Sequence, residues 1–141
     1  MQNSPDYSFL QSPIADFTSA GEKLYKHSLA RIKQAQTPSG GIQASLPGTR
    51  YAGFIYPRDH AYCMLALIRA SEFASARKAL NFLLTCEKSK EHLMEQRYDT
   101  QGKKQAYKPP QIDGNALSVI AIISYFAASK EQPDPSSPAI G

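Results

Sequence analysis

The sequence predicts an all-α protein with two layers of helices, and three observations support this prediction. Four segments show helical periodicity or an unbroken apolar run, with prolines and glycines between them. Two of the four carry charged residues on one side, whereas the other two are apolar nearly all round. The two kinds alternate along the chain. A two-layer helical barrel needs this alternation, because its outer helices keep one solvent-exposed face and its inner helices are covered on both sides.

The first helix is predicted over residues 14–35. Its apolar residues recur at helical spacing and its charged residues fall largely off that stripe, as in an amphipathic helix. The stripe consists of Phe17, Ala20, Leu24, Tyr25, Leu29 and Ile32. Residues 37–41, Thr-Pro-Ser-Gly-Gly, end the helix. Residues 42–56 have no helical period and predict a long ordered loop of the kind that usually has a function.

The second and third helices form the predicted centre of the fold. Pro57 opens the second helix, because a missing N–H costs nothing in the first turn. The run 61–68 is apolar on every side, which predicts burial all round. The third helix, residues 72–86, has a cleaner amphipathic stripe. That stripe consists of Phe73, Ala76, Leu80, Leu83 and Leu84.

A polar segment and one more helix complete the predicted elements. Residues 87–112 are polar, and residues 94–98 within them predict a short strand or an extended arm. A fourth helix covers residues 116–128, starts at Asp113 or Gly114, and is again apolar nearly all round. The four helices are therefore expected to pair antiparallel, with a long loop between the first and the second.

Length and composition indicate a single globular domain. A chain of 141 residues with 42% apolar and 20% charged residues has room for one modest core. We expect that domain over residues 14–129, between a loose leader (1–13) and a disordered tail (130–141). The sequence has no run of eighteen apolar residues and no basic region followed by an apolar core near its start. Neither a membrane span nor a secretory signal is therefore expected.

Several classes of partner and cofactor are disfavoured. The formal net charge is +4, but lysines and arginines form no dense cluster with aromatics, which disfavours nucleic-acid binding. Cys63 and Cys86 lie in apolar helical segments and are expected to be free buried thiols, which suits a reducing cytoplasm. His27, His60 and His92 stand without the partners of a metal site. Because a glycine-rich phosphate loop is also missing, no cofactor is expected.

Two loop-to-helix junctions carry residues suited to a sugar. Residues 54–59 read Phe-Ile-Tyr-Pro-Arg-Asp, and residues 111–115 read Gln-Ile-Asp-Gly-Asn. Aromatic rings cover the apolar faces of sugars, and charged groups bind several hydroxyls each. On spacing alone, plain helix ends explain both junctions better. An Arg58–Asp59 pair would then cap one helix, and Asp113 would be the N-cap of the other.

A third polar cluster lies at residues 95–99, which read Glu-Gln-Arg-Tyr-Asp. Its carboxylates, Glu95 and Asp99, would be the two members of an acid/base pair in one interpretation. A polar extended arm with Arg97 paired locally explains the same residues better.

In order along the chain, these segments resemble glycoside hydrolase family 15, the glucoamylases and their bacterial relatives. The family's Gly-Gly/Val-Ile-x-Ala-Ser segment matches residues 41–45, and its aromatic-x-Arg-Asp helix start matches residues 56–59. Its Pro-Gln-x-Asp-Gly turn matches residues 110–114. The resemblance covers residues 14–128. It implies a partial (α/α)6 barrel of the six-hairpin glycosidase type, of which about four helices are present here.

The resemblance also implies an activity and a sugar site. Members of the family hydrolyse α-glucosidic bonds from the non-reducing end, with inversion. The matching substrate-binding positions are Tyr56, Arg58, Asp59, Tyr107, Gln111 and Asp113. By the resemblance, Arg58 and Asp59 hold hydroxyls of the terminal glucose. Tyr56 and Tyr107 stand at or near positions where relatives often have tryptophan and line the pocket, and Gln111 and Asp113 shape its turn.

The catalytic carboxylates of the family are not expected in this chain. Inverting hydrolysis needs an acid and a base roughly 6.5–9.5 Å apart. In the family the acid glutamate follows the Pro-Gln-x-Asp-Gly helix at some distance, and the base lies near the far end of the barrel. The sequence ends at Gly141, before either of them. We therefore expect an N-terminal portion that is inactive alone, with an α-glucan or oligosaccharide as one partner and the remainder of the barrel as another.

A non-catalytic module is the alternative. The regulatory subunits of phosphorylase kinase look similar over the same helical region, including an Arg-Asp at the helix start, which suggests a glucan-binding or regulatory function. Either interpretation leaves a physical problem, because four helices cannot cover the apolar helices around Leu65 and Ile120. Exposed apolar patches that favour self-association are therefore predicted.

Overall fold

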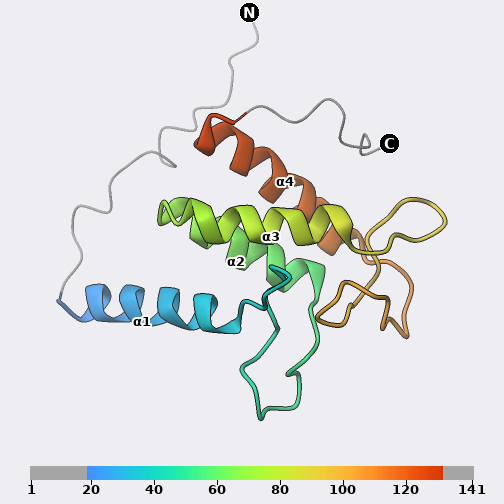
Figure 1. The fold of residues 1–141 in the computed structure, drawn as a ribbon, viewed down its shortest axis with the longest axis horizontal. Helices are drawn as coiled ribbons and strands as arrows, with labels where there is room; N and C mark the ends of the chain where they lie inside the picture. Colours follow the sequence, from blue (N-terminus) through green and yellow to red (C-terminus); the bar gives the residue numbers. More distant parts are fainter. Residues whose placement is uncertain (1–18, 132–141) are drawn as a thin grey trace, which may run out of the picture.

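The computed structural model describes residues 19–131, and this part of the chain is all-helical, as predicted. It has four helices, which are α1 (Ser19–Ala35), α2 (Pro57–Arg69), α3 (Phe73–Thr85) and α4 (Ile112–Ser129). Between residues 19 and 131 the extended segments form only isolated bridges, without a strand. In Figure 1, α1 and α3 run in one direction, while α2 and α4 run in the other.

The core lies between α2, α3 and α4. α2 packs most extensively against α4, and α3 covers both of them, whereas α1 touches the other helices only lightly and extends away from them (Figure 1). Loop residues Ile42, Ile55 and Tyr98 close the core from the side and are almost completely buried. The loops that precede α2 and α4 are therefore part of the folded structure.

The apolar stripe of α1 faces the core less than its periodicity predicted. Leu24 is 69% exposed, and only Leu29, Ile32 and Ala35, toward the end of the helix, pack against the core. Among the described residues, it is the last turns of α1 that pack against the core. The predicted start of this helix at residue 14, and the leader before it, lie outside the described residues.

The start of α2 was predicted correctly, but its burial was not. Pro57 occupies the first turn, and Met64 and Leu67 are fully buried. Tyr62, however, is 59% exposed, so the apolar run is covered on one side only. Cys63 and Cys86 are both free thiols, as predicted, but only Cys86 is buried, whereas Cys63 is partly exposed; burial raises the pKa of each.

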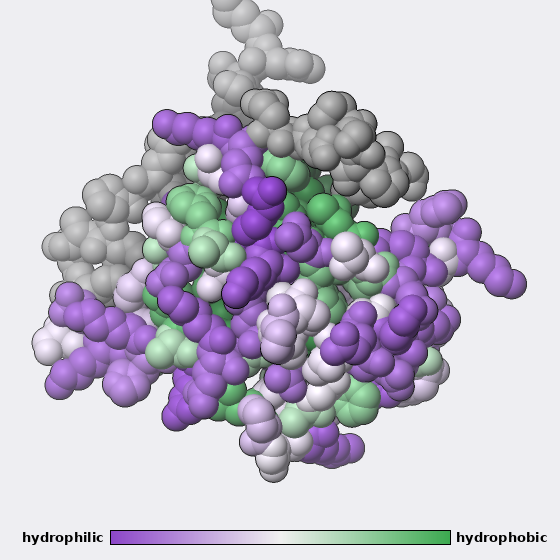
Figure 2. Space-filling view, in the orientation of Figure 1, coloured by the Kyte–Doolittle hydropathy of each residue, from purple (hydrophilic) through white to green (hydrophobic). Residues whose placement is uncertain are grey.

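α4 is longer than predicted and presents an uncovered apolar face. The helix begins at Ile112 rather than at 113–116, and its buried side turns toward α2 and α3. The outer face of α4, which we define as Ile112, Val119, Ile120 and Ile123, is at least half exposed, and Ile123 is 62% exposed. Figure 2 shows hydrophobic surface along this helix. The prediction of exposed apolar patches is therefore confirmed.

α4 also meets one membrane criterion. Within residues 19–131, α4 is the one helix that is long enough and apolar enough to cross a membrane, judged by length and composition only. In the folded chain, 22% of it is buried. Core helices of soluble proteins pass the same test, so the absence of a membrane span stays a prediction. Of the predicted tail, Lys130 and Glu131 are described, and the Glu131 carboxylate accepts a hydrogen bond from Tyr125 at 3.1 Å.

Two glycines let the loop after α1 lie directly on α3. Gly40 has φ +95°, and a Cβ there would collide with the carbonyl of Lys78. A Cβ on Gly41 would collide with Ile55 and would lie 2.8 Å from the Phe82 ring. Glycine is therefore required at both positions by close approach, and at Gly40 by backbone conformation as well.

A buried histidine joins this loop to two helices. The backbone N–H of Ile42 donates to His60 Nδ1 at 3.0 Å, and His60 Nε2 lies 3.0 Å from the carbonyl oxygen of Ala79. Nδ1 must accept, so the proton sits on Nε2 and the ring is neutral. Burial lowers the pKa of His60 from 6.5 to about 4, because the interior disfavours the charged ring.

Candidate functional site

The first turns of α2 and α4 lie side by side. A Cβ on Gly114 would sit 3.5 Å from Pro57 Cβ, which is ordinary contact distance between closely packed helices. Tyr56 and Gln111 are the N-cap residues of the two helices, and both have extended backbone. The two junctions that the sequence singled out therefore meet at one edge of the protein.

Asp113 is not the N-cap of α4, contrary to one sequence interpretation. Gln111 holds that position, and Asp113 lies in the first turn, where its Oδ1 accepts the N–H of Gly114 at 2.8 Å. The difference arises because the helix begins at Ile112, directly after Gln111, whose backbone is extended. Asp113 is thereby free to turn its other carboxylate oxygen toward α2.

An ion pair connects the two helix starts. Arg58 Nη1 donates to Asp113 Oδ2 at 2.9 Å, and Arg58 Nε lies 3.6 Å from Asp59 Oδ1. The hydrogen bond with Asp113 raises the pKa of Arg58, and the same bond holds the pKa of Asp113 below its ordinary value. About half of each of the three side chains is exposed. Their remaining hydrogen-bonding capacity faces water.

Arg97 joins two of the predicted aromatic residues. Its guanidinium carbon lies 4.1 Å from the centre of the Phe54 ring and 4.9 Å from that of Tyr107. Its Nη1 donates to the hydroxyl of Tyr56 at 3.5 Å. Its Nε and Nη2 both donate to the carbonyl oxygen of Gln105, at 3.1 and 2.9 Å. Arg97 was predicted to pair locally, and its partner is the Gln105 carbonyl, eight residues away, rather than a side chain of residues 95–99; its contacts with the tyrosines were not foreseen.

The arm that carries Arg97 is held at both ends. Asn115, in α4, accepts the N–H of Met94 at 2.8 Å and donates to the Met94 carbonyl at 3.3 Å. Tyr98 exchanges two backbone hydrogen bonds of 2.9 Å with Ile55, just before α2. The segment is thus an extended arm without a strand, one of the two forms that the sequence predicted. It connects the start of α4 with the loop that leads into α2.

The carboxylates of the arm are engaged in the fold. Glu95 is 3% exposed, and its Oε1 accepts from Lys104 Nζ at 2.7 Å. Asp99 Oδ1 accepts the backbone N–H groups of Gln101 and Lys103 at 2.8 and 3.0 Å, which closes a turn. These contacts support the structural interpretation of residues 95–99 over an acid/base pair. Glu95 Oε2 and a side-chain oxygen of Gln96 are buried without a hydrogen-bond partner among the described residues.

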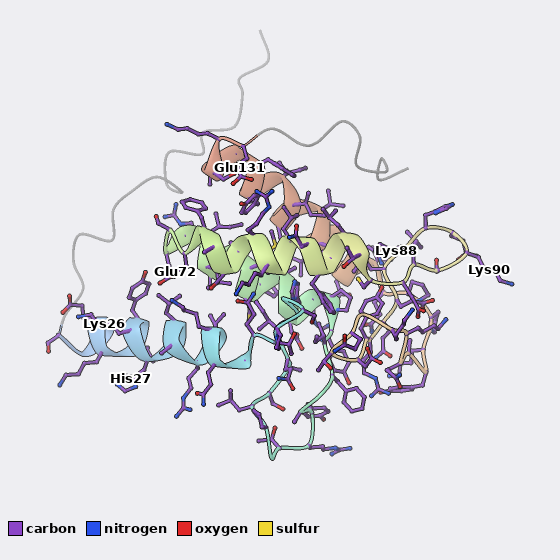
Figure 3. All side chains as sticks on the ribbon, in the orientation of Figure 1. Lys26, His27, Glu72, Lys88, Lys90 and Glu131 are labelled. Carbon is purple, nitrogen blue, oxygen red and sulfur yellow. The ribbon has the colours of Figure 1, made fainter. Side chains whose placement is uncertain are left out.

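A cavity of about 410 Å³ lies beside the arm rather than between the helix starts. Its lining residues are Lys88, Ser89, Lys90, Glu91, Glu95, Lys104, Pro109 and Pro110. Figure 3 shows Lys88 and Lys90 on the loop after α3, with Lys90 near its tip and directed outward. None of the six predicted sugar-binding residues lines this cavity. It adjoins them through the chain, because Pro110, which lines the cavity, precedes Gln111.

The predicted site residues therefore fall into two groups. Tyr56, Arg58, Asp59, Gln111 and Asp113 lie at the paired helix starts. Tyr107 lies outside the helices and is joined to Tyr56 through Arg97. No group of three or more His, Cys, Asp or Glu side chains that could hold a metal ion is found in residues 19–131. Comparisons with models of protein families, with curated proteins and with solved structures each found no match.

Proposed function

We propose that this chain is the N-terminal portion of a glucoamylase-like glycoside hydrolase. Such an enzyme cleaves α-glucosidic bonds of α-glucans or oligosaccharides with inversion. The observation that carries the proposal is the meeting of Arg58 and Asp113 at 2.9 Å, although they stand 55 residues apart in separate motifs of the resemblance. A cytoplasmic location is part of the proposal.

The chemistry of this edge suits one glucose residue. A sugar hydroxyl both donates and accepts, so it can bind a guanidinium and a carboxylate at once. Arg58, Asp59 and Asp113 offer both kinds of partner and are half exposed. The rings of Tyr56 and Tyr107 are suited to the apolar faces of the sugar. We assign these residues, with Gln111 shaping the turn, to part of a glucose-binding subsite.

The arrangement of the helices supports a partial (α/α)6 barrel. α2 and α4 run parallel and pack together, with α3 antiparallel across them (Figure 1). In a two-layer barrel the inner helices are parallel neighbours and the next pair of helices packs beside the last one. The outer face of α4 is apolar and exposed, as expected of an inner helix that further barrel helices would cover.

The chain alone is proposed to be inactive. Each carboxylate in residues 19–131 already has a hydrogen-bond or ion-pair partner within the chain. None of them stands as a free general base opposite the Arg58–Asp113 pair. We therefore assign no catalytic residue to these residues, and binding is the activity to be tested.

Sugar binding and hydrolysis are tested separately. Saturation-transfer NMR with maltose and isomaltose should detect binding to the purified chain. Arg58→Ala should weaken it, and Arg69→Ala, a matched exposed arginine at the other end of α2, should not. Incubation with maltose, isomaltose or starch should release no glucose. Absence of maltose binding would remove the proposed subsite, and robust glucose release would remove the claim of inactivity.

A non-catalytic glucan-binding or regulatory module, like the regulatory subunits of phosphorylase kinase, is the second candidate. The specific observation in its favour is that Arg58 and Asp113 satisfy each other, together with an apolar face on α4 that suits a protein partner. Copurification of a helical partner that completes a barrel and restores hydrolysis would favour the hydrolase. Glucan binding that never leads to hydrolysis would favour the module.

A further inference from the structure

Arg97 is the contact point between the two tyrosines of the proposed site. Tyr56 precedes α2 and Tyr107 precedes α4 by several residues, and Arg97 comes from the arm between α3 and α4. Arg97 bonds to the hydroxyl of Tyr56 and lies against the ring of Tyr107, and it also lies against Phe54. The positions of these rings are therefore coupled through one guanidinium.

The contacts fix the plane of the guanidinium. Nε and Nη2 form a fork on a single acceptor, the carbonyl oxygen of Gln105. A fork of this kind sets the orientation of the planar group, with Nη1 toward the Tyr56 hydroxyl and the guanidinium carbon over the Phe54 and Tyr107 rings. A lysine ammonium has neither a plane nor a fork, and cannot make these contacts together.

We propose that Arg97 is the positioning residue of the sugar site, holding Tyr56 and Tyr107 as one aromatic surface beside the Arg58–Asp113 pair. Arg97 acts through the two tyrosines and does not itself bind the sugar. The inference rests on the proposed function, since it names the group that orders the same subsite. Its structural half, the coupling of the two rings, is measurable without any sugar.

The first experiment follows the tyrosine rings by NMR in the full chain with ¹³C-labelled tyrosine. The variants are Arg97→Lys, which keeps the charge, and Arg97→Met, which keeps the length of the side chain. Arg50→Met is the matched control, because the Arg50 guanidinium lies 5.5 Å from the centre of the Tyr51 ring, away from the site. Both Arg97 variants should shift the Tyr56 and Tyr107 ring signals, and the control should shift only that of Tyr51.

The second experiment measures maltose affinity in the same variants. Affinity should fall about tenfold or more in both Arg97 variants and stay at the wild-type level in the Arg50 control. Methyl spectra of the core report whether each variant is folded. If Arg97→Met is unfolded, Arg97→Lys, with its charge and long stem retained, decides the comparison.

The outcomes separate this inference from the proposed function. Unmoved Tyr56 and Tyr107 signals in a folded Arg97 variant overturn the inference, and so do moved rings with wild-type maltose affinity. If the wild-type chain binds no maltose, the proposed function fails, and the ring signals alone decide whether Arg97 positions the two tyrosines.

Discussion

Acid should weaken this fold through His60. The neutral ring accepts from Ile42 and donates to Ala79, and it is completely buried. The pKa of His60 is about 4 in the folded chain and 6.5 in the ordinary state that we take for the unfolded chain. Between these values the unfolded chain binds more protons. The stabilisation by neutral His60 is therefore complete above about pH 6.5 and is lost as the pH falls toward 4.

The expected loss is large compared with the stability of a small domain. One pKa unit corresponds to about 1.4 kcal/mol, so the gap between 6.5 and about 4 amounts to about 3 kcal/mol. About 2 kcal/mol of this should be gone at pH 5, because folded His60 is still mostly neutral there while the unfolded histidine is charged. Domains of this size unfold with about 5–15 kcal/mol, so the change is measurable.

Urea unfolding followed by circular dichroism at pH 8, 6.5 and 5 measures this loss; the chain has no tryptophan for fluorescence. His60→Gln keeps a donor for the Ala79 carbonyl but does not titrate, so its unfolding free energy should change much less between pH 8 and pH 5. His27→Gln, on an exposed position of α1, controls for the loss of a histidine.

Two results would refute the argument about His60. One is a wild-type unfolding free energy that changes by less than about 0.5 kcal/mol between pH 8 and pH 5. The other is a His60→Gln variant that loses as much as the wild type over the same range. The NMR shifts of the ring nitrogens give an independent check, since they report both the pKa of His60 and the proton on Nε2.

Three further substitutions probe the loop, the arm and the outer face of α4. Gly40→Ala should lower the unfolding free energy by about 2 kcal/mol or more, because its Cβ would collide with the Lys78 carbonyl. Gly114→Ala, whose Cβ would meet only ordinary contacts, should change the unfolding free energy by less than about 1 kcal/mol. Equal effects of the two substitutions would contradict the geometry. Asn115→Ala should cost about 1–2 kcal/mol in urea unfolding, because it removes both bonds to the Met94 backbone, and an unchanged midpoint would argue against this anchor. Ile123→Glu should shift the chain toward monomer in gel filtration, an expectation that fails if the wild type already elutes as a stable monomer.

Much of the helical framework could be predicted from local patterns. Pro57 defines the start of α2 because its missing N–H is tolerated only in a first turn, and the stripe around Leu80 and Leu83 defines the buried side of α3. Periodicity does not reveal which neighbours exist, however. Leu24 in α1 and Ile123 in α4 belong to apolar faces that the described chain leaves exposed.

The site could be predicted only in part, because local patterns do not reveal which residues become neighbours in space. The order of the motifs indicated Arg58 and Asp113, and local spacing alone would have assigned both to helix ends. Arg97 had no usable signal, because its contacts depend on how residues 94–98 fold back. That path is fixed by backbone hydrogen bonds to Ile55 and by Asn115, and backbone bonds leave no residue pattern in the sequence.

The charge of the paired helix starts distinguishes a neutral sugar from a phosphate. Two helix N-termini side by side would ordinarily attract an anion. Here Asp59 and Asp113 already lie in those first turns, and Arg58 keeps Asp113 ionised by lowering its pKa. Arg58 and Arg97 balance Asp59 and Asp113, so these four side chains sum to zero net charge, while Lys108 contributes a further cation at the Tyr107 ring, 5.5 Å from its centre.

A neutral edge of this kind should prefer uncharged hydroxyls. Maltose should therefore bind the wild-type chain more tightly than glucose 6-phosphate in saturation-transfer NMR. Asp113→Asn removes one negative charge and leaves Arg58 with Asp59 alone, so it should raise the affinity for the phosphate and lower that for maltose. Asp99→Asn, in a turn outside the helix starts, is the charge-matched control. Equal or tighter binding of the phosphate by the wild-type chain would show that the carboxylates do not neutralise the helix starts, and would count against a sugar at this edge.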